Sequence, residues 1–261
     1  MNKSTSKAKN QFTEAHFQEA IAKPRLRQPL PQYLPGNRSG GKVRVLNEDE
    51  LNAMTQQWFV DYERKIQLYA QHGLDIGWTL EWAKKYWWSW LMRDMSFNSE
   101  LYAPDLRYKD PTTFGRIIVG MDDFISYNFS FLEAIPDWRY DPLPGQIYVD
   151  VTPEGETRII VRYIGSGHFS GSLRFYPFDD TAPVLHGAGM FVQCTAVDRY
   201  HFNKDGLMYE GETLWDFIDA AQSSGILPSE NSWIFKTLMK SSRLAGILQK
   251  AKQHVPFLGG A

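Results

Sequence analysis

The chain has 261 residues, of which 43% are hydrophobic and 15% aromatic, so it carries ample apolar material for a folded core. Its formal net charge is −2. No apolar run reaches the length of a membrane span, and the polar N-terminus lacks the apolar stretch of a secretory signal. Cys194 is the only cysteine, which excludes an intrachain disulfide and a multi-cysteine zinc site.

These features predict a cytoplasmic protein without an integral membrane segment. No nucleic-acid-binding motif is present and the histidines lack metal-ligand spacing, so we expect neither nucleic acid, nor a metal, nor a cofactor. The charge is unevenly distributed: residues 1–45 hold nine Lys or Arg against two acids, residues 231–261 hold five against none, and residues 46–230 are strongly acidic. Basic ends of this kind usually fold back onto an acidic body.

Residues 1–45 are dense in Pro, Gly and Arg, a composition that predicts an extended basic arm. An additional helix is predicted within 46–77, because acids follow Asn47 and Gly73 stands at its end. A second helix is predicted from about Asp75 to Met95. Its residues Trp78, Trp82, Tyr86 and Trp90 recur at a spacing of four and form an aromatic stripe.

Two short strands on either side of Pro111 and a helix ending before Pro136 follow. Strand patterns then occupy 138–151, 157–165, about 168–178 and 189–202, and the turn Asn203–Gly206 predicts a hairpin with a returning strand. A further helix ends at Gly225, and 229–261 is predicted to be an amphipathic helical extension. This order predicts an α+β fold with a curved antiparallel sheet wrapped around helices.

The strand 189–202 carries a carboxylate on its apolar face. By alternation, Asp198 shares that face with Cys194, Ala196, Tyr200 and Phe202. An unpaired buried charge is costly, so a carboxylate at this position needs a structural or functional explanation. We expect Asp198 to point into a conical cavity between sheet and helices.

Four stretches, VDRYHFNKDG, YKDPTTFGRIIVGMDDF, LEAIPDW and GSGHFSG, resemble in order and spacing the SnoaL-like polyketide cyclase and ketosteroid isomerase-like family of the nuclear transport factor 2-like superfamily. The resemblance covers residues 78–228. It implies a cone-shaped α+β barrel as one SnoaL-like domain, a homodimer, and acid–base chemistry on an apolar, polycyclic carbonyl compound: isomerisation, cyclisation or dehydration.

The resemblance also implies roles for four residues. Asp110, before Pro111, matches the proton-carrying base, and Asp198 matches the carboxyl that holds the oxyanion or, in the cyclases, acts as the base. Tyr86 lies 24 residues before Asp110, where the isomerases place a hydrogen-bond donor, and His168 matches an assisting residue. A carboxyl in an apolar cavity has a raised pKa, which suits Asp198 to either role.

Aromatic side chains are the expected contacts of the substrate. We expect these to be Trp82, Trp90, Phe124, Tyr200 and Phe202. Two other functions stay open: a non-catalytic ligand-binding or scaffold protein of the same fold, and an epoxide hydrolase. The latter needs an Asp–Arg–Asp cluster, and Arg199 lies on the strand face opposite Asp198, which counts against it.

Each of the four residues also has a structural interpretation. Tyr86 could be core, Asp110 could cap a turn, Asp198 could pair with an arginine, and a backbone group could satisfy His168. Beside these, the segment 231–254 has an apolar stripe next to five basic residues. We expect this stripe to dock on the same subunit or on a dimer partner rather than on lipid.

Overall fold

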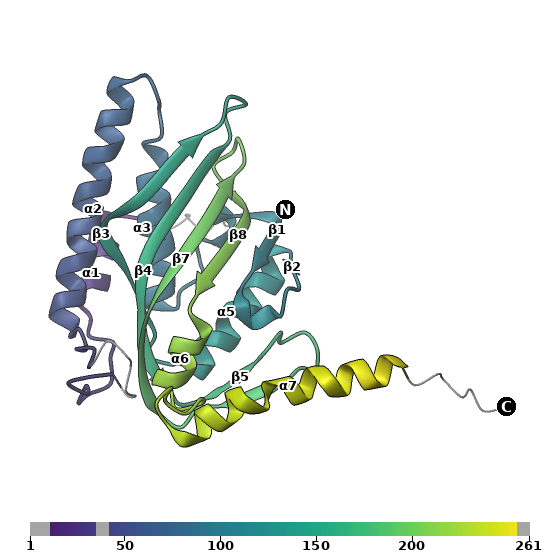
Figure 1. Cartoon of the computed structure of the whole chain (residues 1–261). Coiled ribbons are helices and arrows are strands. Elements are labelled where there is room, and N and C mark those ends of the chain that lie inside the picture. The colour runs from purple at the N-terminus through teal and green to yellow at the C-terminus, as the bar shows by residue number, and fades with distance from the viewer. Residues whose placement is uncertain (1–10, 35–41, 255–261) are drawn as a thin grey trace, which may run out of the picture.

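The computed structural model describes residues 11–34 and 42–254. A curved six-stranded sheet with the order β2-β1-β8-β7-β4-β3 dominates the molecule (Figure 1). Its strands are β1 (Tyr102–Lys109), β2 (Ile118–Val119), β3 (Arg139–Val151), β4 (Thr157–Phe169), β7 (Met190–Phe202) and β8 (Met208–Trp215). A separate short hairpin pairs β5 (Ser172–Arg174) with β6 (Val184–His186).

The sheet is mixed, whereas the sequence predicted an antiparallel one. β1 and β8 run parallel, and all other neighbours in the sheet are antiparallel. The prediction was wrong here because β1 and β8 are not consecutive strands, so no hairpin pattern links them in the sequence. Within the described ranges the sheet is open, with β2 and β3 as its edges, and does not close into a barrel.

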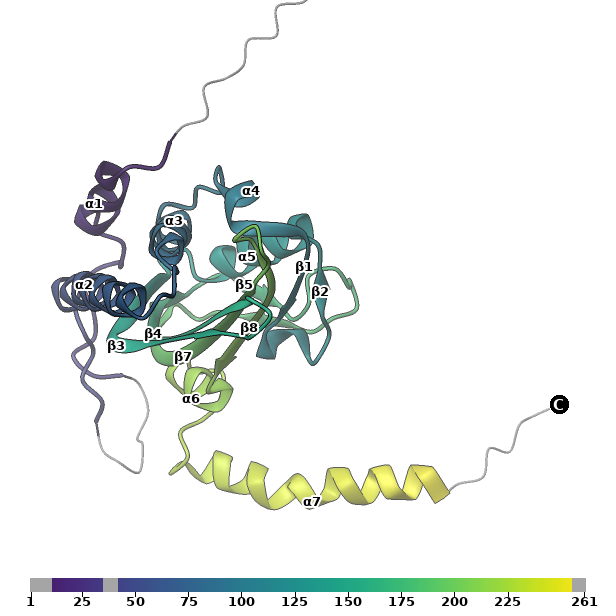
Figure 2. The same ribbon diagram turned by 90° about the horizontal axis from the view of Figure 1, so that it is seen from above.

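The helices lie around this sheet (Figure 2). They are α1 (Glu14–Ala22), α2 (Glu48–Gln71), α3 (Trp78–Met92), α4 (Asn98–Leu101), α5 (Met121–Ala134), α6 (Phe217–Ser223) and α7 (Trp233–His254), with the 3₁₀ turn η1 (Pro111–Thr113) after β1. α3 and α5 cover the concave face, so the core lies between these helices and the inward side chains of the sheet.

α2 protects the edge strand β3. Asn47 caps the helix by accepting from the Glu50 amide, and the Glu50 carboxylate accepts from the Asn47 amide in return. Further along the helix, Lys65 donates to the Ile147 carbonyl, and the Tyr69 hydroxyl donates to the Val149 carbonyl at 3.2 Å. These contacts occupy carbonyls that an exposed edge would offer to another chain.

A buried ion pair fastens the start of α2 to β3. Arg139 and Asp141 are 1% and 0% exposed, with 2.7 Å between Nη2 and Oδ1. Arg139 Nη1 also lies 2.9 Å from a Glu48 carboxylate oxygen, and the Thr55 hydroxyl donates to Asp141 at 3.0 Å. Both charges are therefore compensated inside the protein, the condition for burying them.

The first part of the chain is not simply an extended arm, as the sequence predicted. α1 buries Phe17, Ala20 and Ile21, and the Phe17 ring packs against Phe59 of α2 and Trp87 of α3. The composition argument missed this helix because it averaged over the arm, whereas these three apolar residues recur at helical spacing.

α7 stands off the body of the molecule (Figure 2). Its apolar side chains are exposed: Trp233, Ile234, Leu238, Met239, Leu244 and Ile247. The expected docking of this stripe on the same subunit is therefore not observed; docking on a partner subunit stays a prediction. No helix of the described residues has both the length and the apolar content to cross a bilayer.

The ion pair predicts how β3 and α2 respond to mutation. We expect Arg139→Met to lower the free energy of unfolding by about 3–5 kcal/mol, because Asp141 is then left buried without its cation. The double variant Arg139→Met/Asp141→Leu should recover most of this loss. Chemical denaturation measures both, with the exposed Arg199→Met as the control, expected to cost less than about 1 kcal/mol. An equal loss in the single and double variants would contradict the ion-pair account.

The exposed stripe of α7 predicts the assembly of the chain. The described bases of α7 face solvent, and no acid occurs in 231–261, so the acidic body of a second copy is a complementary partner. We expect sedimentation velocity to show a dimer for the full chain and a monomer after deletion of 229–261. Pelleting with anionic vesicles that depends on this segment would instead assign the stripe to lipid.

Candidate functional site

A cavity lies between the concave face of the sheet and helices α3 and α5, and α6 and the β5–β6 hairpin bound its other end. Its wall is mainly aromatic and aliphatic, and its free volume is about 100 Å³. The residues that line the cavity include Tyr86, Trp90, Tyr108, Asp110, Tyr127, Asn128, Trp138, Tyr140, Tyr163, Leu185, Cys194, Asp198, Thr213 and Trp215. The structure thus brings Tyr86, Asp110 and Asp198 to one cavity.

Asp198 points into this cavity from β7 and is 2% exposed. Its two carboxyl oxygens have separate partners: the Tyr200 hydroxyl donates to Oδ2, and the Thr213 hydroxyl donates to Oδ1 at 2.7 Å. The chain of hydroxyls continues on both sides, because Tyr86 lies 3.1 Å from the Tyr200 hydroxyl and Tyr108 bonds Thr213. The carboxyl is held by neutral donors and not by an arginine.

This environment sets the protonation of the group. Burial away from water raises the pKa of Asp198 to about 7, because the hydrogen bonds from Tyr200 and Thr213 offset only part of the desolvation. Burial, with the nearby Asp198 charge, also raises the pKa of Tyr86 and Tyr108 well above the ordinary value. At neutral pH these tyrosines keep their protons, while the protonated and the ionised form of Asp198 are both populated.

Asp110 is held differently. It caps η1 through its Oδ1, which accepts from the Thr112 amide at 2.8 Å and the Thr112 hydroxyl at 2.7 Å, and its Oδ2 accepts from the Trp215 indole at 3.2 Å. Desolvation raises the pKa of Asp110, and these hydrogen bonds lower it in part. The turn-capping interpretation and the cavity position therefore both apply.

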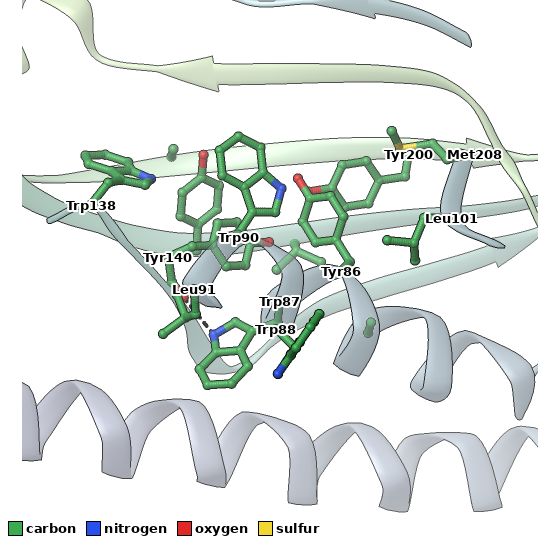
Figure 3. Packing of buried hydrophobic residues seen from close by; sticks show 14 of the residues in the cluster. Tyr86, Trp87, Trp88, Trp90, Leu91, Leu101, Trp138, Tyr140, Tyr200 and Met208 are labelled. Atoms are coloured by element: carbon green, nitrogen blue, oxygen red, sulfur yellow. Dashed lines mark hydrogen bonds between the residues drawn. The ribbon is translucent and has the colours of Figure 1, made fainter. Parts of the chain in front are cut away.

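Tyr86 reaches the cavity because α3 divides its aromatic residues between two sides. Figure 3 shows Tyr86 and Trp90 on the side of the helix that faces Tyr200, with Trp87 and Trp88 on the opposite side. The Trp87 indole donates to the Tyr140 carbonyl at 2.8 Å and so fixes the helix on β3. The crowded helix is a scaffold on one side and a cavity wall on the other.

His168 lies outside the cavity, contrary to the expected assisting role. On β4, Tyr163 and Phe169 face the cavity, so alternation turns His168 to the opposite face of the sheet. There its ring nitrogen lies 2.6 Å from an Asp137 oxygen, and its amide donates to the same carboxylate at 2.7 Å. This position does not support the assisting role that the motif suggested.

Of the five expected substrate contacts, only Trp90 lines this cavity. Trp82, Tyr200 and Phe202 pack together behind its wall, and Phe124 packs on Tyr102 and Tyr108. Tyr200 nevertheless acts on the site through its hydrogen bond to Asp198. Tyr200 and Phe202 lie further along the same strand face, over the part of α3 that carries Trp82, and therefore outside this cavity.

Several cavity residues were not predicted from the sequence: Tyr108, Tyr127, Asn128, Tyr140, Tyr163 and Thr213. A signal for two of them existed in strand alternation. Tyr163 lies opposite Ala196 and Thr213 opposite Asp198, and partners in an antiparallel pair share a face. Locating them required the strand register, which the sequence leaves open.

The glycines of GSGHFSG make room for the cavity wall. A Cβ on Gly165 would lie 2.2 Å from the Trp138 ring, and one on Gly167 would lie 2.4 Å from Ile135. Both glycines lie inside the regular strand β4. Trp138 can line the cavity only because β4 has no side chains there.

The site lacks the groups for two other chemistries. Arg199, the arginine considered for an epoxide hydrolase, pairs outside with Glu210 at 3.2 Å and Glu212 at 3.0 Å. No Lys, Arg or His is among the described residues that line the cavity. In the same part of the chain, no group of three or more His, Cys, Asp or Glu side chains is placed to hold a metal ion.

No family model and no curated protein matches the chain. Solved structures do. A proposed SnoaL-like polyketide cyclase from Jannaschia sp. CCS1 is 20% identical, covering 50% of this chain and 78% of its own, with a TM-score of 0.35. TsrD from Streptomyces laurentii is 13% identical, with coverages of 59% and 99% and a TM-score of 0.46. IdmH from Streptomyces antibioticus, a proposed polyketide cyclase, is 14% identical, with coverages of 56% and 96% and a TM-score of 0.40.

The buried carboxyl predicts a pH-dependent stability. Asp198 binds its proton more tightly in the folded chain (pKa about 7) than in the unfolded chain (about 4), so the free energy of unfolding falls as pH rises through this window. Asp198→Asn cannot titrate. We expect the free energy of unfolding of Asp198→Asn, relative to that of wild type, to be higher at pH 8 than at pH 4 by at least about 1 kcal/mol. Denaturant unfolding at both pH values measures this, with the exposed Asp105→Asn as control; the same difference at both values would contradict it.

Proposed function

We propose that the cavity binds a small apolar carbonyl compound and that Asp198 moves a proton at the carbon next to the carbonyl, the step common to isomerisation, cyclisation and dehydration. The observation that carries this proposal is the Asp198 carboxyl: it is buried, reaches the cavity, and has a pKa of about 7. A group that takes and returns a proton works best when its pKa is near the working pH.

Asp198 is the better candidate for the base than Asp110. Three hydrogen bonds hold the Asp110 carboxylate, two of them from the turn that it caps. Moving a proton onto Asp110 would weaken the cap of η1, whereas Asp198 can be protonated while Tyr200 and Thr213 reorient their hydroxyl hydrogens. We assign Asp110 to holding the wall beside β8 through Trp215.

The removed proton leaves a negative charge on the carbonyl oxygen, which the cavity must stabilise. Tyr86 lines the cavity and keeps its proton at neutral pH because burial raises its pKa. Once Asp198 is protonated, Tyr200 can turn its hydroxyl hydrogen to Tyr86, which frees the Tyr86 hydroxyl to donate to that oxygen. Once Asp198 carries the proton, it is neutral and no longer repels the enolate. It returns the proton at a second carbon, which completes an isomerisation without net proton uptake.

The volume of the cavity limits the size of the substrate that it can hold. A free volume of about 100 Å³ is close to that of a cavity that accepts a single benzene ring, about 150 Å³. A one-ring or compact two-ring ketone therefore suits the observed shape better than the polycyclic compound first expected. A larger ligand would need side chains of α6, such as Phe217, to move.

Exchange of carbon-bound hydrogen tests this without knowledge of the natural substrate. We expect the protein to accelerate deuterium uptake next to the carbonyl of 2-indanone in D₂O, followed by NMR. Asp198→Asn should lose roughly 10²–10⁴-fold of this rate, the usual contribution of a positioned base. Asp110→Asn should keep most of it.

The variants also separate the competing functions. If 2-indanone binds but wild type and Asp198→Asn exchange it at the same rate, the cavity is a binding site without catalysis. If Asp110→Asn alone loses the activity, Asp110 is the base, and our assignment of the two carboxyls is wrong. Circular dichroism of each variant controls for loss of fold.

A further inference from the structure

Asn128 stands out among the residues of the cavity wall. It lies on α5, is 0% exposed and lines the cavity. Neither its Oδ1 nor its Nδ2 has a hydrogen-bond partner in the protein, and among the described residues it is the one buried side-chain amide with both ends unpaired. Buried polar atoms are nearly always hydrogen-bonded, so this exception asks for a cause.

The neighbours of Asn128 do not explain it structurally. An amide placed for packing alone is normally replaced by an apolar residue, because an unsatisfied donor and acceptor destabilise the fold. Tyr127 beside it already has its own partner, since its hydroxyl bonds Thr112 at 2.9 Å. Within the protein the amide has no partner, so a ligand of the cavity is the group left to pair with it.

We infer that Asn128 is a specificity-determining residue that selects ligands carrying a neutral hydrogen-bond donor and acceptor side by side, as in a carboxamide or a lactam. This inference rests on the proposed function, because it concerns the ligand of the same cavity. Oδ1 accepts from the N–H of such a group and Nδ2 donates to its carbonyl oxygen. A ligand that leaves either end of the amide unpaired gains less affinity, because a buried donor or acceptor without a partner is costly.

The charge of the wall supports a neutral ligand over an acidic one. Two carboxyls, Asp110 and Asp198, line the cavity, and none of its described residues is Lys, Arg or His. A carboxylate ligand would be buried without a counter-charge and beside groups of its own sign. An amide keeps the same planar shape as a carboxylate and carries no charge.

Three single-ring probes of similar size test the inference by calorimetry: benzamide, acetophenone and benzoate. Benzamide offers donor and acceptor, acetophenone only an acceptor, and benzoate a charge. For wild type we expect benzamide to bind about tenfold more tightly than acetophenone, and benzoate more weakly than either. Asn128→Leu should bring the benzamide-to-acetophenone ratio to about one while leaving acetophenone affinity within about threefold.

Controls and contrary outcomes are distinct. Leu185→Met alters an apolar wall residue with little change in volume and should keep the wild-type preference. Asn128→Ser replaces the Leu variant if that one does not fold. Binding of both rings with equal affinity to wild type would overturn the role of Asn128 and leave the proposed function standing. Binding of no probe at all would overturn the ligand site and with it both proposals.

Discussion

The burial of one carboxyl among neutral hydroxyls is the constraint on which the site depends. Asp198 has no cation beside it, so its charge is tolerated only through the hydrogen bonds from Tyr200 and Thr213. Those partners come from β7 and β8, and they are held in turn by Tyr86 of α3 and Tyr108 of β1. The hydrogen bonds of Asp198 therefore depend both on the register of the sheet and on the position of α3 against it.

The rest of the fold keeps that arrangement in place from outside. The Arg139–Asp141 pair and the edge contacts of α2 fasten the first helical layer to β3, and Trp87 fastens α3 to the same strand. Charged groups that are fully paired lie on this outer side, while the cavity holds two carboxyls and no cation among its described residues. The paired charges that stabilise the fold thus lie apart from the two cavity carboxyls, which are available for chemistry.

Periodicity in the sequence was enough to predict most elements. The acidic start after Asn47, the aromatic stripe on α3, and the alternation around Asp198 all reappear as structure. The sequence predicted two strands, 157–165 and about 168–178, whereas β4 runs unbroken from Thr157 to Phe169, and this continuity turns His168 to the face opposite Tyr163.

What the sequence could not provide were relations between distant segments. The parallel pairing of β1 with β8, the approach of Trp138 to Gly165, and the unpaired state of Asn128 depend on residues that are far apart along the chain. Register decides which tyrosines share the cavity, and register is fixed by packing as a whole. Most of the aromatic residues expected around the ligand therefore lie outside the cavity, and other aromatic residues line it.

The position of Cys194 has a practical consequence. It is the sole cysteine of the chain, it is 7% exposed, and it lines the cavity opposite Gly165. The cavity therefore offers a thiol-directed reagent a route to this side chain. The rate at which Cys194 is alkylated therefore reports how often a molecule enters the cavity from solvent. A ligand bound in the cavity should lower this rate, so its binding can be followed without engineering a label into the chain.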